Sequence, residues 1–162
     1  PMPHKSVFES GWVKLEAGWQ APELSQKWEA LRDIRSEVNK VLERARNDKA
    51  IGSSLEAKLL LYVADPQLQT LLQALNPTAG QGSNGVDELR YLFLTSQVQL
   101  LDSLKPLEGL SYIYQSDSLG VGVVDADGQK CDRCWNYSNH VGESKAHPLL
   151  CERCIPALDG QF

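Results

Sequence analysis

The residues of this sequence that could do chemistry are its cysteines. All four lie in the last 32 residues, as two Cys-x-x-Cys pairs separated by 16 residues. Two residues between paired cysteines let a tight turn aim both thiolates at one point, and four thiolates at tetrahedral corners suit Zn²⁺. The separation of the two pairs also lies in the usual range for zinc ribbons. The sequence therefore predicts one Zn²⁺ ion held by Cys131, Cys134, Cys151 and Cys154.

The predicted zinc is structural, because four protein ligands leave no coordination position open for water. A ribbon this small buries little, so metal binding is coupled to its folding and contributes about 10–16 kcal/mol in comparable peptides. A redox dithiol would need only one pair, and His140 or His147 could replace a cysteine only if one of the four pointed away. Lys130, Arg133 and Arg153 are expected to offset part of the negative charge of the zinc–thiolate centre.

Trp135, which follows the second cysteine directly, has two interpretations. Its ring either covers the metal site as part of a small ribbon core, or is an exposed platform beside Arg133 on which an unpaired nucleic-acid base stacks. The residue types alone favour neither. Arg153 has no comparable aromatic neighbour in the sequence, so we expect it to be solvated or to face the thiolates.

Composition bounds the class of protein. The chain has 162 residues, 42% hydrophobic and 23% charged, as is typical of globular proteins. A net charge of −5 argues against indiscriminate coating of nucleic acid, although eight of the sixteen Lys and Arg residues fall between Lys27 and Lys58. No apolar run approaches the roughly 18 residues of a membrane span, and no secretory signal is visible. We therefore expect a cytoplasmic chain with no membrane partner.

The element that must carry these modules is an amphipathic helix over residues 23–48. Its apolar residues recur at helical spacing from Leu24 and Trp28 to Ala45, and charged residues occupy the other face. Asn47, Asp48 and Gly52 end it. Residues 1–22 show no sustained period and are expected to form an irregular lead-in.

A small mixed module is expected between this helix and the cysteines. Residues 55–63 alternate as a half-buried strand does, and Asp65-Pro66 begins a short helix that ends at Asn76. The remaining predicted elements are a mobile loop over 78–85, a short helix from Asp87 to Arg90, and strands over 91–101, 111–115 and 120–124. The fold class is thus α+β: a long amphipathic helix, a small mixed α+β module and a C-terminal four-cysteine zinc ribbon. The corresponding predicted domains are 1–54, 55–129 and 130–162, with the strand order left open.

Two stretches resemble the C-terminal part of bacterial-type isoleucyl-tRNA synthetases. One is Arg35-Ser-Glu-Val-Asn-Lys-Val-Leu-Glu-Arg-Ala-Arg46 with Ile51-Gly-Ser-Ser-Leu-Glu-Ala57, which looks like the end of that family's helical anticodon-binding region. The other is Lys130-Cys-Asp-Arg-Cys-Trp135 with Val141-Gly142 and Leu150-Cys-Glu-Arg-Cys154, which resembles its terminal zinc finger. A related finger occurs in formamidopyrimidine-DNA glycosylases, but they lack the first stretch. Residues 64–129 match loosely.

The resemblance implies a chain that helps to hold the anticodon stem-loop of isoleucine tRNA. It further implies that Arg133 and Trp135 contact anticodon bases, since bases of a loop can be splayed out and stacked on aromatic rings. The implied partners are isoleucine tRNA and the catalytic body of the parent synthetase, with the chain itself a monomer. Neither of the family's ATP-site signatures, His-Ile-Gly-His and Lys-Met-Ser-Lys-Ser, is present, so we expect the chain alone to be inactive.

A second class of function remains open, that of a zinc-stabilised protein-interaction or structural module. The acidic net charge and the apolar helix face support it. A DNA-repair enzyme is a weaker third hypothesis, because no acidic residue follows Pro1 as the chemistry of a catalytic amino-terminal proline requires.

Overall fold

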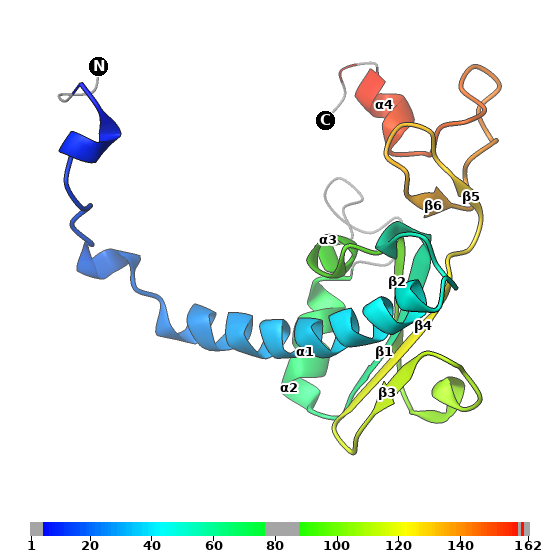
Figure 1. Cartoon of the computed structure of the whole chain (residues 1–162), viewed down its shortest axis with the longest axis horizontal. Coiled ribbons are helices and arrows are strands. Elements are labelled where there is room, and N and C mark those ends of the chain that lie inside the picture. The colour runs from blue at the N-terminus through cyan, green and yellow to red at the C-terminus, as the bar shows by residue number, and fades with distance from the viewer. Residues whose placement is uncertain (1–4, 77–87, 159, 161–162) are drawn as a thin grey trace.

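The protein, seen in a computed structural model that describes residues 5–76, 88–158 and 160, has three parts: a long helix, a four-stranded sheet with two short helices, and a two-stranded ribbon (Figure 1). The expected α+β class is confirmed. Among the described residues, no helix is long and apolar enough to cross a membrane.

Helix α1 spans Pro22–Asn47, so the predicted long helix is confirmed to within one residue at each end. Proline occupies its first turn, where no amide hydrogen bond is lost. Its apolar stripe is buried only from Leu31 onward, at Leu31, Ile34, Val38, Val41, Leu42 and Ala45. Leu24 and Trp28 lie on the same stripe yet are 53% and 50% exposed. Figure 1 shows why: this end of α1 extends away from the sheet.

The lead-in before α1 is irregular, as expected. It contains two single-turn 3₁₀ helices, η1 (Val7–Glu9) and η2 (Ala17–Trp19), neither of which contains a buried residue. Phe8 and Trp12 are almost fully exposed, at 94% and 99%. The apolar side chains of this segment are therefore not covered by the residues that the structure describes.

The sheet has the strand order β2-β1-β4-β3. Its strands are β1 (Ala57–Val63), β2 (Gln97–Leu101), β3 (Ile113–Gln115) and β4 (Leu119–Asp125). Strands β1 and β2 are parallel, whereas β4 is antiparallel to both β1 and β3. The parallel pair needs a crossover, and its described parts are α2 (Pro66–Ala74) and α3 (Glu88–Phe93).

The C-terminal half of α1 covers one face of this sheet. It shares a single hydrophobic core with α2, α3 and the inward residues of β1 and β4, such as Leu59, Leu61 and Val121. On the opposite face, the short turn η5 (Lys105–Leu107) packs Leu107 against Leu60. A Cβ at Gly122 would meet the end of the Leu107 side chain at 2.7 Å, so a larger residue here would displace Leu107 from its buried position against β4.

Two sequence predictions need correction or fall outside the described chain. The strand expected from Tyr91 to Leu101 begins only at Gln97, because α3 continues to Phe93. Leu89 and Phe93, four residues apart, are both buried in the core, and this helical spacing overrides the local strand signal. The loop predicted over 78–85 and the cap predicted at Asp87 lie among residues 77–87, which the structure does not describe.

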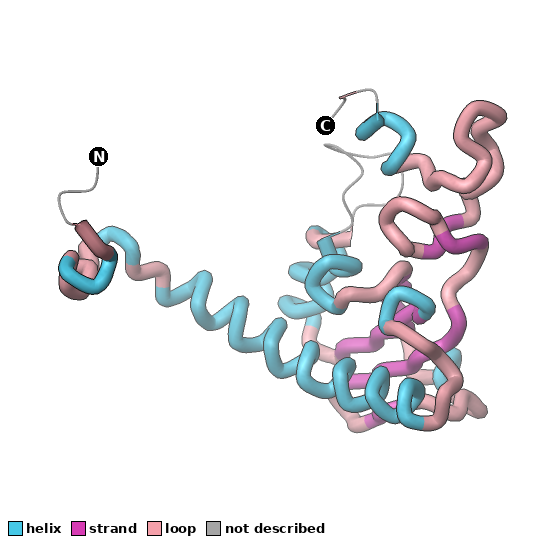
Figure 2. Tube along the Cα trace, turned by 45° about the horizontal axis from the view of Figure 1, so that its top comes forward, coloured by secondary structure: helices cyan, strands magenta, loops and turns pink. Residues whose placement is uncertain are grey.

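The ribbon consists of β5 (Gln129–Lys130), β6 (Tyr137–Ser138) and the short helix α4 (Cys154–Leu158). It continues directly from β4. Figures 1 and 2 place it beyond one end of the sheet, well apart from the protruding half of α1. The four-stranded sheet with α2 and α3, which we call the sheet module, therefore connects α1 to the ribbon and orients the ribbon.

Candidate metal centre and nucleic-acid interface

The four cysteines of the ribbon converge on one point. Their Sγ atoms all lie within 4.8 Å of one another, and those of Cys134 and Cys151 are 3.7 Å apart. A zinc tetrahedron with Zn–S bonds of about 2.3 Å has edges of about 3.8 Å, whereas a disulfide requires about 2.05 Å. The four thiols thus match a zinc site and not a pair of disulfides. We call them the four-cysteine cluster.

Each cysteine pair sits on a turn closed by backbone hydrogen bonds. In the first turn, the Trp135 amide donates to the Cys131 carbonyl at 2.8 Å and the Cys131 amide donates to the Asn136 carbonyl at 2.9 Å. In the second, the amide of Cys154 donates to the carbonyl of Cys151 at 3.0 Å. The Cys151 amide also donates to the Cys131 sulfur at 3.3 Å and so joins the two turns.

Three of the four cysteines, Cys131, Cys151 and Cys154, are buried, and burial together with nearby amide donors sets the proton affinity of the thiols. Burial raises the pKa of Cys131, but amide donors from Cys134, Cys151 and Arg133 outweigh it and bring the pKa down to about 6. Burial raises the pKa of Cys151 to about 12 and also raises that of Cys154. A divalent ion is therefore needed to hold all four sulfurs as thiolates at neutral pH.

The cations near the cluster take three different partners. Arg133 donates from Nη1 to the Cys154 sulfur at 3.7 Å, which is a position from which its charge would offset that of a thiolate. Lys130 instead places its Nζ 5.3 Å from the centroid of the Trp135 ring. Arg153 was expected to be solvated or to face the thiolates; its guanidinium lies 5.4 Å from the ring centroid of Tyr91 on α3, an aromatic partner that is not adjacent in the sequence. Tyr91 is 40 residues or more from the ribbon cysteines in sequence, which is why sequence proximity did not find it.

Trp135 is presented outward by the first turn. It is 61% exposed, so its ring does not serve as a buried ribbon core. Its backbone has a φ of 64°, a left-handed conformation that L-residues adopt only when the surrounding turn holds them there. The apolar contacts of the cluster come instead from Val141 and Leu150. Of the two interpretations of Trp135, the exposed one fits the geometry.

The two histidines considered as alternative ligands are not part of the cluster, which consists of cysteines. His140 places Nδ1 2.9 Å from the Glu143 carboxylate, and this hydrogen bond raises the pKa of His140. Ser138 donates to Glu152 at 2.7 Å and accepts from the His140 amide at 3.1 Å. These bonds tie the loop after β6 to the second cysteine turn.

Ser96 joins the ribbon to the sheet module. Its side chain is fully buried, its hydroxyl donates to the Leu55 carbonyl, and the same oxygen accepts from the Tyr137 amide at 2.7 Å. One hydroxyl therefore connects Leu55, two residues before β1, with the first residue of β6. Nothing in the local sequence around Ser96 indicated this role, since its two partners are both 41 residues away.

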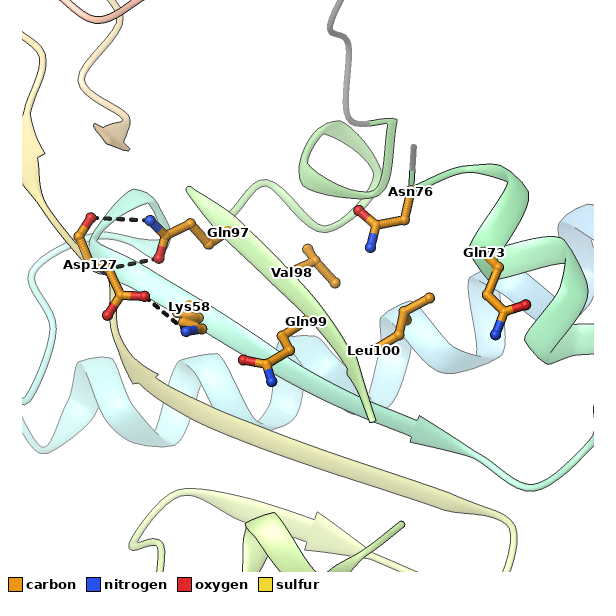
Figure 3. A pocket seen from close by; sticks show the side chains of 8 residues that line it. All are labelled: Lys58, Gln73, Asn76, Gln97, Val98, Gln99, Leu100 and Asp127. Atoms are coloured by element: carbon orange, nitrogen blue, oxygen red, sulfur yellow. Dashed lines mark hydrogen bonds and ion pairs between the residues drawn. The ribbon is translucent and has the colours of Figure 1, made fainter. Parts of the chain in front are cut away.

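A second attachment lies at the edge strand β2, in an open groove of about 560 Å³ shown in Figure 3. There the Gln97 amide group makes two hydrogen bonds with the Asp127 backbone, at 2.8 Å and 3.1 Å. Lys58 also pairs with the Asp127 carboxylate at 2.8 Å. Asp127 lies on the connection from β4 to β5, so these contacts hold the strand that enters the ribbon.

Taken together, the fold and the site define a zinc-finger protein in which a four-cysteine ribbon is fixed to a small α+β module. Residues 128–157 match the family described as the zinc finger found in FPG and IleRS. This match covers both cysteine turns and Trp135.

The whole chain is similar to isoleucine–tRNA ligases. It is 64% identical over 160 residues to that of Nostoc sp. (strain PCC 7120) and 59% identical over 160 residues to that of Gloeothece citriformis, in each case 99% of this chain. The protein from Acaryochloris marina is 64% identical over 156 residues, or 96% of this chain. The chain spans about a sixth of the length of these curated relatives, 16–17%. It is homologous to the C-terminal part of isoleucyl-tRNA synthetase.

Proposed function

We propose that this chain is the tRNA-binding portion of an isoleucyl-tRNA synthetase and that its ribbon contacts bases of the anticodon stem-loop of isoleucine tRNA. The observation that carries the proposal is Trp135, an indole 61% exposed on a turn that the metal makes rigid. An exposed aromatic face is a sequence-tolerant platform for an unpaired base. Similarity to isoleucine–tRNA ligases supports isoleucine tRNA as the RNA that is bound.

Arg133 is the second residue of this proposed interface. One of its guanidinium nitrogens is engaged by the Cys154 sulfur, and a guanidinium carries five N–H donors in a planar fork. The sulfur contact fixes the direction of the fork, and the remaining donors can bind a base edge. In this arrangement, zinc supplies the rigidity of the ribbon while Arg133 and Trp135 supply the contacts.

The test is a titration of the full chain with an isoleucine tRNA transcript, comparing wild type with Trp135→Ala. Loss of one base–aromatic stack, worth about 1–3 kcal/mol, should weaken binding roughly 5- to 150-fold. Zinc content should stay at one ion per chain, which shows that the ribbon is intact. Equal affinity of the two proteins would refute the stacking role.

The remainder of the parent synthetase is the proposed protein partner. Trp28 and Leu24 on α1, with Trp12 and Phe8 in the lead-in, are large apolar side chains that the described residues leave exposed. Exposed apolar surface of this kind can mark protein contacts in soluble proteins. We propose a cytoplasmic location and a monomeric chain. We also propose that this chain does not aminoacylate tRNA alone, because the ATP-site signatures are absent from its sequence.

The same exposed apolar side chains favour one alternative function, a zinc-stabilised protein-interaction or structural module. A salt titration separates the two hypotheses. RNA binding through phosphate contacts weakens steeply with salt, whereas docking through apolar side chains responds little. A tRNA affinity that does not change with salt would argue against phosphate contacts and would support the alternative.

A further inference from the structure

The indole of Trp135 has unequal faces. The Lys130 ammonium lies over the ring, 5.3 Å from its centroid, within the distance at which a cation is attracted to an aromatic face. Lys130 is itself exposed. One face of the ring therefore already has a cationic neighbour, although the side chain as a whole is 61% exposed.

The backbone fixes this pair on both sides. Lys130 is paired with Tyr137 in the register of β5 and β6. The backbone N–H of Trp135 donates a hydrogen bond to the Cys131 carbonyl, which holds Trp135 in the turn. The two residues flank the first cysteine turn, one immediately before Cys131 and the other immediately after Cys134. Their contact therefore depends on the geometry of that turn, which the metal stabilises.

We propose that Lys130 makes Trp135 a one-sided platform: a single unpaired base stacks on the free face, and the Lys130 ammonium binds a phosphate of the same single strand. This inference rests on the proposed stacking role of Trp135. It assigns to Lys130 a phosphate contact and limits the ring to one base.

The chemistry of the side chain supports this division of roles. A cation–π contact uses the charge of the ammonium group and leaves N–H donors free, and a lysine ammonium carries three. Arg133 is less suited to the phosphate, because its guanidinium is directed toward the Cys154 sulfur. Lys130 is thus the cation of the first turn whose charge lies beside the stacking ring.

Salt dependence of RNA binding tests the phosphate contact. The full chain is titrated with a transcript of the isoleucine tRNA anticodon stem-loop at several salt concentrations. Lys130→Gln should flatten the plot of log K against log salt by about 0.7, the value for one phosphate of a single strand. The matched control is Lys145→Gln, which removes the same charge from an exposed position between the two cysteine turns and should leave the slope unchanged. Lys130→Arg should retain the wild-type slope.

Quenching of Trp135 fluorescence by acrylamide tests the one-sided geometry without RNA. In a background with Trp12, Trp19 and Trp28 replaced by phenylalanine, Trp135 is the single tryptophan. Lys130→Gln should raise the quenching constant, because it opens the second face, whereas Lys145→Gln should not. Zinc content is measured for each variant to confirm that the ribbon has folded.

The outcomes separate the two proposals. Equal slopes and equal quenching for Lys130→Gln and Lys145→Gln would overturn the role of Lys130 while leaving the base contact of Trp135 intact. If Trp135→Ala binds the stem-loop as tightly as wild type, or if wild type does not bind it, the stacking function itself fails. A changed slope with unchanged quenching would refute the one-sided platform and keep only a phosphate contact.

Discussion

The Ser96 hydroxyl accepts a hydrogen bond from the Tyr137 amide at 2.7 Å. A fully buried side chain of the sheet module thus contacts the first residue of β6 in the zinc ribbon. The same hydroxyl donates to the Leu55 carbonyl. A single oxygen atom therefore satisfies two backbone groups from segments far apart in sequence. The orientation of the ribbon on the sheet depends on this bond and on the contacts of Asp127.

Ser96→Ala should loosen the ribbon from the sheet. The substitution leaves the Tyr137 amide and the Leu55 carbonyl without this partner, at a cost of about 1–3 kcal/mol. Hydrogen exchange of the Tyr137 amide should become faster, while zinc stays bound. Ser96→Thr, which keeps the hydroxyl, is the control for loss of this group. Unchanged protection of Tyr137 in Ser96→Ala would show that the bond does not hold the ribbon.

Arg153 and Tyr91 should be energetically coupled, because the guanidinium lies 5.4 Å from the ring centroid. Cation–π contacts at exposed sites are worth about 0.5–1 kcal/mol. A double-mutant cycle of Arg153→Gln and Tyr91→Leu, measured by chemical denaturation, should return a coupling energy of that size. Additive effects of the two substitutions would mean that the contact contributes nothing to stability.

Cys151→Ser should abolish zinc binding, because it removes one of the four sulfurs that lie within 4.8 Å of one another. The ribbon then loses the metal to which its folding is coupled. The helical circular-dichroism signal of α1 should persist, since its buried face packs on the sheet and not on the ribbon. Atomic absorption gives the zinc content. A variant that still holds one ion per chain would show that another ligand completes the site.

Acidification should release zinc from the wild-type protein. Burial raises the pKa of Cys151 to about 12 in the absence of metal, so zinc must displace a proton from this thiol at neutral pH. Lower pH favours the protonated thiols, so the apparent zinc affinity should rise with pH and fall as protons are added. A colorimetric chelator assay across pH 5–8 follows the release. Zinc affinity independent of pH over this range would contradict thiolate ligation.

Gly128→Ala should destabilise the ribbon more than Gly142→Ala does. Both glycines have positive φ, 87° and 100°, so alanine is strained at either position. At Gly128 the new Cβ would also collide with the backbone of Ser138, whereas at Gly142 it meets nothing within 4 Å. The difference in unfolding free energy between the two variants measures the cost of this collision. Equal losses would place the whole effect in the backbone angle.

Local patterns in the sequence were sufficient for the main elements. The apolar spacing from Leu24 to Ala45 marked the face of α1 that is buried from Leu31 onward, and alternation marked β1, because both signals depend on residues a few positions apart. The sequence prediction placed the start of β2 too early, because the end of α3 depends on contacts with distant residues. Burial of Leu89 and Phe93 against α1 and the sheet keeps α3 helical to Phe93, and that burial depends on distant parts of the chain.

The sequence by itself determined the metal site, because two residues between paired cysteines fix the geometry of each turn locally. Only the tertiary structure determined how the ribbon is attached to the sheet module and which side chains surround the metal site. The Ser96 bond to Tyr137 and the Arg153 contact with Tyr91 join segments that are tens of residues apart. Strand order and these contacts depend on which surfaces can be buried together. The spacing of residues along the chain does not reveal this, because the surfaces come from distant segments.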